Sequence, residues 1–124
     1  MHGDNAPDLW RLPWPAGKSF HGIREYGAAV IYVAAPDGPP RKLPHQVLHS
    51  PAGLEWGYGG SGPADAAYSI LVHLVGRRLA MVLHQDFKWE FIAPLPRADG
   101  WALSDAEILR WVQAKMDEKE MEAP

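Results

Sequence analysis

Residues 50–74, SPAGLEWGYGGSGPADAAYSILVHL, constrain the possible folds of this chain more than any other stretch. Four glycines fall within six residues there: Gly57, Gly59, Gly60 and Gly62. Glycine permits positive φ angles and close approach of other groups to the backbone, so such a run marks a tight corner. Pro63 suits the first position of a helix, and Gly62 or Ser61 is the expected N-cap. Asp65 would fall in the first turn, where the helix dipole favours a negative charge. We therefore predict a strand, a glycine-rich corner and a helix.

The length and composition of the chain indicate a single globular domain. It has 124 residues, of which 47% are hydrophobic and 22% charged. The absence of cysteine excludes disulfides and thiolate metal sites and suits a reducing cytoplasm, where we expect the protein. The N-terminus lacks the pattern of a signal peptide, and no apolar run approaches the ~18 residues of a membrane span. The net charge of −3 argues against general affinity for nucleic acids.

The first half of the chain has the pattern of an antiparallel meander. Residues 18–34 favour two strands, the second of them the β-branched run AAVIYVAA. The PDGPP sequence that follows is a turn, because Asp-Gly bends the chain and proline stops strand pairing. RKLPHQVLHS is a weaker third strand, since Pro44 cannot donate to a ladder and suits an edge. LEWGY, residues 54–58, is the expected fourth strand.

The second half is predicted to be helical. Ala64, Ala67 and Leu71 follow helical spacing, with Gly76 as the helix stop. Residues 79–93 fit either a helix or a strand, and their length before Pro94 favours a helix. Ser104 and Glu107 form a capping box that begins a third helix.

These elements predict an α+β fold. A β-meander of three to four strands would be followed by three helices, packed on one face of the sheet. An irregular arm rich in Trp and Pro would occupy residues 1–17, the single α+β domain residues 18–116, and an acidic frayed tail residues 117–124.

The glycine corner is also a candidate anion site. Gly57, Gly59 and Gly62 give a literal G-x-G-x-x-G before a helix, the pattern in which a helix N-terminus holds phosphate. The context differs from a dinucleotide fold, because the preceding strand belongs to a meander rather than a βαβ unit. A structural corner is therefore the main interpretation. The candidate ligand-binding residues are Gly59, Gly60, Ser61 and Gly62.

Other residues are candidates for binding a partner protein. Aromatic anchors and cations are the usual energetic centres of interfaces, and Glu55 beside the corner is either a structural or a functional carboxylate. The candidates are Trp10, Trp14, Glu55, Arg77, Arg78, Lys88 and Trp89. The histidines lack the spacing of three converging metal ligands, and no catalytic set is visible. We predict no metal, no cofactor and no catalytic residue.

The sequences SPAGLEWGYGGSGPADAAYSIL, HQDFKWEFIAPLP and GWALSDAEILRWV resemble a family of small uncharacterised proteins from bacteriophages, plasmids and other mobile elements. Its signature is close to SPxGFEWGYGGSGPADLALSIL, from which this chain departs at Leu54, Ala66 and Tyr68. The resemblance covers about residues 23–112 and implies action inside a bacterial host cell. It implies no catalytic mechanism.

Two functions follow as hypotheses. The first is a non-enzymatic accessory protein that binds a host protein or complex, most concretely an anti-defence inhibitor of the anti-CRISPR type. The alternative is a small anion- or nucleotide-binding protein or enzyme that uses the glycine corner. Binding of nucleic acid through Arg77, Arg78, Lys88 and Arg97 ranks last because of the net charge, and no membrane association is expected.

Overall fold

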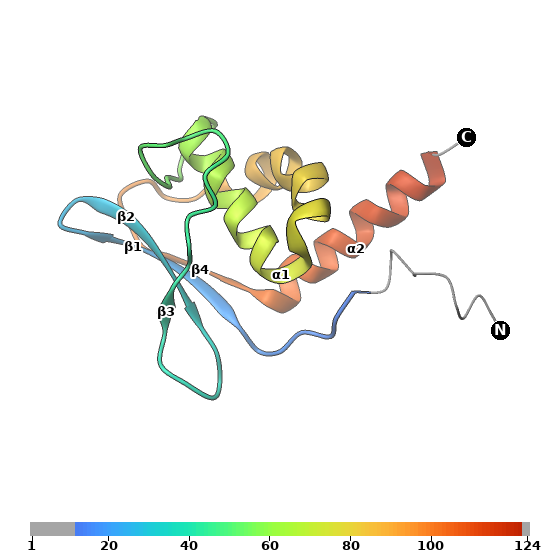
Figure 1. Cartoon of the computed structure of the whole chain (residues 1–124), viewed down its shortest axis with the longest axis horizontal. Helices are drawn as coiled ribbons and strands as arrows, with labels where there is room; N and C mark the ends of the chain where they lie inside the picture. Colours follow the sequence, from blue (N-terminus) through green and yellow to red (C-terminus); the bar gives the residue numbers. More distant parts are fainter. Residues whose placement is uncertain (1–11, 123–124) are drawn as a thin grey trace.

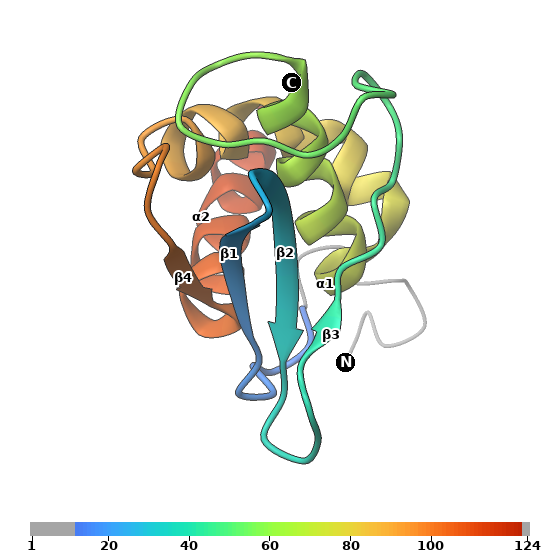
Figure 2. The same cartoon turned by 90° about the vertical axis from the view of Figure 1, so that its left-hand side faces the viewer.

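A computed structural model describes residues 12–122 of the chain, and it shows an α+β fold. The elements in order are β1 (Ser19–Glu25), β2 (Ala28–Ala34), β3 (Arg41–Lys42), α1 (Ser61–Phe87), the π-helical turn η1 (Lys88–Ile92), β4 (Trp101–Ser104) and α2 (Asp105–Glu122). The strands form one antiparallel sheet in the order β3-β2-β1-β4. Both helices lie on the same side of this sheet (Figures 1 and 2).

The predicted meander is confirmed for its first three strands. β1 and β2 pair along their whole length, from Ser19 opposite Ala34 to Glu25 opposite Ala28. Tyr26 and Gly27 both have positive φ, 52° and 83°, as the two central residues of a type I′ hairpin turn require. β3 is an edge strand, as Pro44 indicated, but it has only two residues, and residues 43–50 of the predicted third strand are not strand.

Alternation along three strands builds one apolar face toward the helices. The inward residues are Phe20 and Gly22 on β1, Ile31 and Val33 on β2, and Trp101 and Leu103 on β4. Gly22 lies opposite Trp101, and a Cβ atom on Gly22 would overlap the Trp101 indole. Glycine at this position therefore lets the indole lie across the strand.

The predicted fourth strand is wrong. Residues 54–58 are not a strand; the fourth strand is β4, which lies between the helices in sequence and pairs with the free edge of β1. Leu54 and Trp56 are buried as the alternation predicted, but by packing into the core rather than by pairing in the sheet. The Trp56 ring meets the Trp101 ring edge-to-face at 5.3 Å between centroids.

The prediction of three helices is also not matched, since the described residues contain two. The expected stop at Gly76 is confirmed, since its φ of 86° and ψ of 170° are not helical. A second helical stretch begins directly at Arg77, so α1 consists of two helical halves joined by a sharp break. The two halves run side by side, as the views in Figures 1 and 2 and the Tyr68–His84 ring contact of 5.5 Å indicate. Residues 79–93 are helical almost throughout, which resolves their ambiguity in favour of a helix.

α2 confirms its predicted cap and extends further than expected. Ser104 Oγ accepts a hydrogen bond from the Glu107 N–H at 3.1 Å. The helix continues to Glu122, so the predicted frayed tail, 117–124, is helical over its described part. Gln113 donates to Asp117 one turn later, and the residues that follow are mostly good helix formers, which accounts for the extension.

One helical stretch, Ser61–Ile92, is by length and composition alone apolar enough to cross a membrane, with a mean hydropathy of 1.4 in its most apolar window. The break at Gly76 divides it into halves of about 22 Å, shorter than the ~30 Å hydrocarbon core of a bilayer. Residues 62–71 are all buried within the domain. These apolar side chains therefore form the protein's own core.

Candidate functional site

The glycine corner connects the extended segment 54–58 to α1. The N-cap is Gly60 (φ −110°, ψ −166°) rather than Gly62 or Ser61, and its carbonyl accepts the first helical bond from the Ala64 N–H at 3.1 Å. Ser61 is the first helical residue, so Pro63 stands at the third position and not at the first. No side chain caps this end. Pro63 is still within the first turn, where proline is tolerated because the first N–H groups have no helical acceptor.

The corner glycines are needed mainly for close packing. Only Gly57 has a positive φ, 89°, and its N–H donates to the Ile92 carbonyl at 3.1 Å. A Cβ atom at each of the four positions would meet a side chain of the protein: Arg97 at Gly57, Trp89 at Gly59, Tyr58 at Gly60 and Glu55 at Gly62. The space that a phosphate occupies over such glycines is taken here by the protein's own side chains.

These packing residues define a surface patch, which we call the corner surface. It consists of Arg24, Glu55, Tyr58, Lys88, Trp89 and Arg97. Arg24 on β1 is its organising residue. Its Nη1 atom donates to Glu55 Oε2 at 2.9 Å, its Nη2 atom donates to the Arg97 carbonyl at 2.7 Å, and its guanidinium lies over the Trp56 ring at 4.6 Å. The connector after η1 is thereby fixed against β1 and the corner.

Two further cations of the corner surface lie on exposed aromatic rings. The Arg97 guanidinium lies 4.6 Å from the centroid of Tyr58, which is 38% exposed. Lys88 Nζ lies 4.3 Å from the centroid of Trp89, which is 58% exposed. Lys88 itself is only 7% exposed, and no carboxylate among the described residues pairs with Lys88 or Arg97. Both rings thus face the outside of the corner, one in contact with the exposed Arg97 guanidinium and the other with the buried Lys88 ammonium.

Glu55 is a fixed anion at the edge of this surface. The hydrogen bond from Arg24 lowers the pKa of Glu55, against the opposing effect of burial. The carboxylate is therefore charged at neutral pH and is held by Arg24. This geometry supports the structural alternative for Glu55, in which it positions Arg24.

The structure brings together only some of the predicted partner residues. Trp89 packs at Gly59 with the Lys88 ammonium over its ring, and Glu55 packs at the nearby Gly62. Arg77 and Arg78 instead lie at the break of α1. About ten residues separate Arg78 from Lys88 along the second half of α1, a distance of about 15 Å. The two arginines therefore do not belong to the corner surface.

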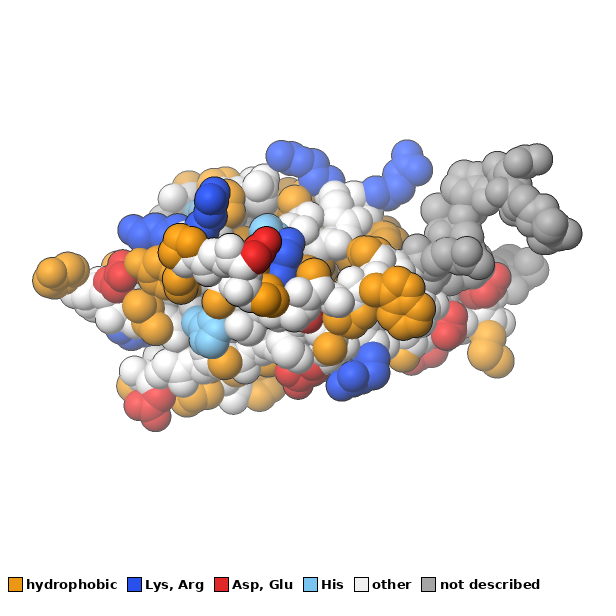
Figure 3. Space-filling view, turned by 90° about the horizontal axis from the view of Figure 1, so that it is seen from below, with side chains coloured by type: hydrophobic (Ala, Val, Ile, Leu, Met, Phe, Trp, Pro, Cys, Tyr) orange, Lys and Arg blue, Asp and Glu red, His pale blue; other side chains and the backbone are white. Residues whose placement is uncertain are grey.

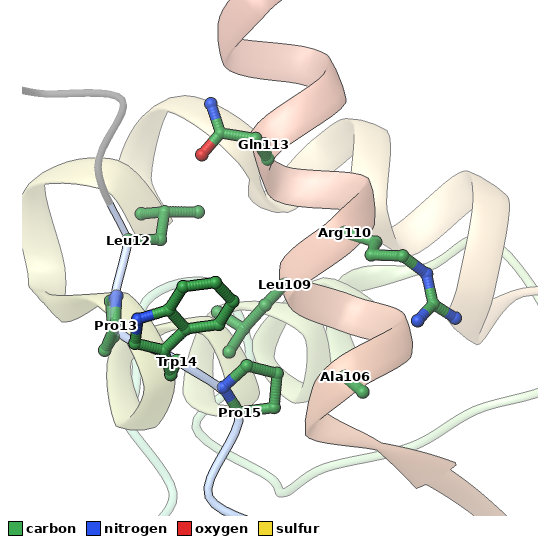
Figure 4. A pocket seen from close by; sticks show the side chains of 8 residues that line it. All are labelled: Leu12, Pro13, Trp14, Pro15, Ala106, Leu109, Arg110 and Gln113. Carbon is green, nitrogen blue, oxygen red and sulfur yellow. The ribbon is translucent and has the colours of Figure 1, made fainter.

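The two tryptophans of the arm were also predicted to bind a partner. Trp10 is outside the described residues. Trp14 is 91% exposed and borders a shallow pocket between residues 12–15 and α2, beside Leu109 (Figure 4). The arm is fixed next to β1 not by this tryptophan but by Asp105, whose Oδ2 atom accepts from the Ala16 and Lys18 N–H groups at 2.7 and 3.1 Å.

Asp65, expected only to favour the helix dipole, has a different role. It is fully buried, and its two oxygens accept hydrogen bonds from four donors of the loop that crosses the start of α1: His45 Nε2 (2.8 Å) and the N–H groups of Leu48 (3.1 Å), His49 (2.8 Å) and Ser50 (3.0 Å). Burial raises the pKa of Asp65, but these hydrogen bonds outweigh it and the net pKa is lowered. Asp65 therefore fastens the loop to the core helix.

The histidines are distributed over separate contacts. His45 binds Asp65, while His49 Nε2 and His84 Nε2 lie 3.0 Å apart, and His84 Nδ1 faces the Met81 carbonyl at 3.0 Å. Within residues 12–122 no three His, Asp or Glu side chains converge as metal ligands would.

Sequence reasoning missed two members of the corner surface, Arg24 and Tyr58, and named Arg97 only as a candidate for binding nucleic acid. Arg24 and Arg97 are 73 residues apart and meet only because β1 and the connector lie side by side in the fold. Tyr58 had a local signal, as an aromatic residue inside a glycine run that can leave its ring exposed.

No curated protein and no solved structure matches this chain. Residues 20–114, which include the sheet, the corner and most of both helices, match a family of unknown function, DUF6166. The chain therefore belongs to the DUF6166 family.

Proposed function

We propose that the protein is a non-enzymatic accessory protein of bacteriophages or other mobile elements. In this proposal it binds a protein or complex of the bacterial host in the cytoplasm, most concretely as an anti-defence inhibitor of the anti-CRISPR type. The resemblance of the corner sequence to proteins of mobile elements motivates the biological setting. The corner surface supports the binding role.

The observation that carries the proposal is the pair of cation–aromatic contacts on the corner surface. Trp, Tyr and Arg are the residue types most enriched among interface hot spots, and the surface contains Trp89, Tyr58, Arg24 and Arg97. Arg24 is held by Glu55 and by the Arg97 carbonyl, which limits the conformations to be lost on binding. A preorganised aromatic patch of this kind suits docking to a protein surface.

The charge of the corner surface specifies the complementary partner. It carries three cationic side chains and one carboxylate, so its net charge is positive on a chain whose overall charge is negative. Electrostatic complementarity then favours a partner with an acidic patch around an apolar pocket. General binding to nucleic acid would require a wider basic surface, which the separation of Arg77 and Arg78 from the corner does not provide.

The experiment is a capture assay with matched tryptophan variants. The purified wild type, Trp89→Ala and Trp14→Ala are each immobilised and exposed to host lysate, and the stoichiometry of any retained complex is measured. We expect Trp89→Ala to lose a stoichiometric partner and Trp14→Ala to keep it. A typical hot-spot loss of ~2 kcal/mol or more corresponds to about a 30-fold lower affinity.

A glycine variant separates binding from folding. A Cβ atom at Gly59 would displace the Trp89 ring, which is partly exposed and free to move, so Gly59→Ala should reduce partner binding with little effect on stability. If the wild type captures no host protein, or if Trp14→Ala and not Trp89→Ala loses the partner, the proposed role of the corner surface is wrong.

A further inference from the structure

A pocket lies at the end of the molecule opposite the glycine corner. It is lined by Lys18 before β1, the loop between β2 and β3, β3 itself and His73 in the first half of α1. Its volume is 590 Å³, within the ~300–1,000 Å³ usual for small-molecule sites. The floor is apolar, and Gly38 in the loop has open space where a side chain would stand.

The charged side chains that line this pocket are mostly basic. They are Lys18, Arg41, Lys42 and Asp37, joined by His73 of α1. Lys42 lies opposite Tyr32 in the sheet, and its Nζ atom lies 3.9 Å from Glu25 on the outer face, so its charge is directed away from the pocket. Arg41 lies opposite the inward residue Val33, and within residues 12–122 it makes no ion pair. On the face seen from below in Figure 3, Lys and Arg side chains, a histidine and an acidic group lie close together.

The two cations whose charges face the pocket, Lys18 and Arg41, are far apart in the chain, which is why the sequence did not reveal the cluster. Lys18 is placed by the hydrogen bonds between its backbone and Asp105, and Arg41 and Lys42 are placed by the pairing of β3 with β2. Burial and the charge of Lys18 together lower the pKa of His73, so the Lys18 ammonium contributes a positive potential at the imidazole. With Lys18 and Arg41 against the single carboxylate of Asp37, the pocket has an excess of positive charge.

We propose that this pocket binds a small anion with two or more negative charges, of the phosphate or polycarboxylate type. Lys18 and Arg41 would contact the charged groups, and Arg41 suits a planar two-point contact with them. The apolar floor would hold the uncharged part of the ligand. This site is separate from the corner surface, so its occupancy does not depend on the function proposed above.

The test measures the affinity of the full chain for pyrophosphate, inorganic phosphate and citrate by isothermal titration calorimetry, with chloride as the singly charged control. Lys18→Gln and Arg41→Gln should each weaken binding by about tenfold, since each removes a charge-assisted contact. Asp37→Asn should strengthen binding severalfold, because it removes the opposing carboxylate. Arg78→Gln is the matched control: it removes the same charge from an exposed arginine outside the pocket.

A second measurement locates the ligand. The ring signals of His73, followed by NMR, should shift during the titration. The ring signals of His49, which does not line the pocket, should not shift. Preference for pyrophosphate or for citrate identifies which of the two anion types the pocket takes. If none of the three anions binds at concentrations up to about 10 mM, where even weak specific binding is detected, the proposal is overturned. Equal losses for Arg41→Gln and Arg78→Gln overturn it as well, since they would show attraction to net charge only.

Discussion

Replacing Asp65 by asparagine tests the most unusual polar group in the core. The carboxylate is fully buried and accepts hydrogen bonds from four donors of one loop, among them the N–H groups of His49 and Ser50 at 2.8 and 3.0 Å. Asparagine has nearly the same shape, but only one of its two terminal atoms can accept. At least one donor of the loop would then face an NH₂ group.

The magnitude follows from the number of these bonds. A hydrogen bond to a charged group contributes about 1.5–3 kcal/mol, so four would suggest about 6–12 kcal/mol if they were independent. They share two oxygens, and the outer part of the loop can regain water, so we expect a loss of about 3–5 kcal/mol in the free energy of unfolding. This is the range seen when one partner of a buried charged network is removed. For a domain of this size it lowers Tm by about 10–20 °C.

The assay is urea unfolding at pH 7, followed by circular dichroism and tryptophan fluorescence, for the wild type, Asp65→Asn and Asp99→Asn. Asp99 is exposed in the connector before β4, and its variant should stay within about 0.5 kcal/mol of the wild type. A loss below about 1 kcal/mol for Asp65→Asn would refute the reasoning. It would mean that the four hydrogen bonds do not hold the loop on the helix.

Three further predictions concern stability. Gly22→Ala should lower the free energy of unfolding by about 2–4 kcal/mol, because the new methyl group overlaps the buried Trp101 indole. Gly38→Ala is the control: it has open space around it and should be nearly neutral in the same urea titration. Gly76→Ala should lower the free energy of unfolding by about 1–3 kcal/mol, because φ 86° and ψ 170° lie in a region that essentially only glycine adopts. Thermal unfolding measures this loss, and an unchanged Tm would show that the break of α1 does not need this conformation. Because the folded-state pKa of Asp65 lies below its unfolded value, its stabilisation is complete above about pH 4 and is lost as pH falls through the folded pKa. A urea midpoint that decreases on acidification in the wild type, and less in Asp65→Asn, checks this sign.

The parts of the fold that follow local chemistry were predictable. The β1–β2 hairpin, the weak edge strand before Pro44 and the capped start of α2 at Ser104 depend on residues within a few positions of each other. The interruption at Gly76 was also visible, because glycine marks a change of direction. The direction that the second half of α1 takes after this break was not visible, since it depends on packing against Tyr68 and the core.

The parts that depend on distant pairing were not predictable. β4 has only four residues, and its alternation of Trp101 and Leu103 is too short to distinguish a strand from the connector before it. Residues 54–58 have an equally good alternating pattern, but they pair with no strand. A tight corner was predictable from its four glycines, but the side chains that pack against them were not, and only Gly57 has a positive φ. Arg24 and the basic pocket had no local signal at all.

The position of β4 also determines the order in which this protein can form as it leaves the ribosome. β1 lies between β2 and β4, so one edge of the first strand stays unpaired until about 80 further residues have been translated. At typical rates of ~5–20 residues per second this interval lasts several seconds. During this time the hairpin exposes an unpaired strand edge and the apolar face that Trp101 will cover, a feature that favours association with other chains. Early synthesis is therefore the stage at which the edge of β1 is most open to pairing with another chain.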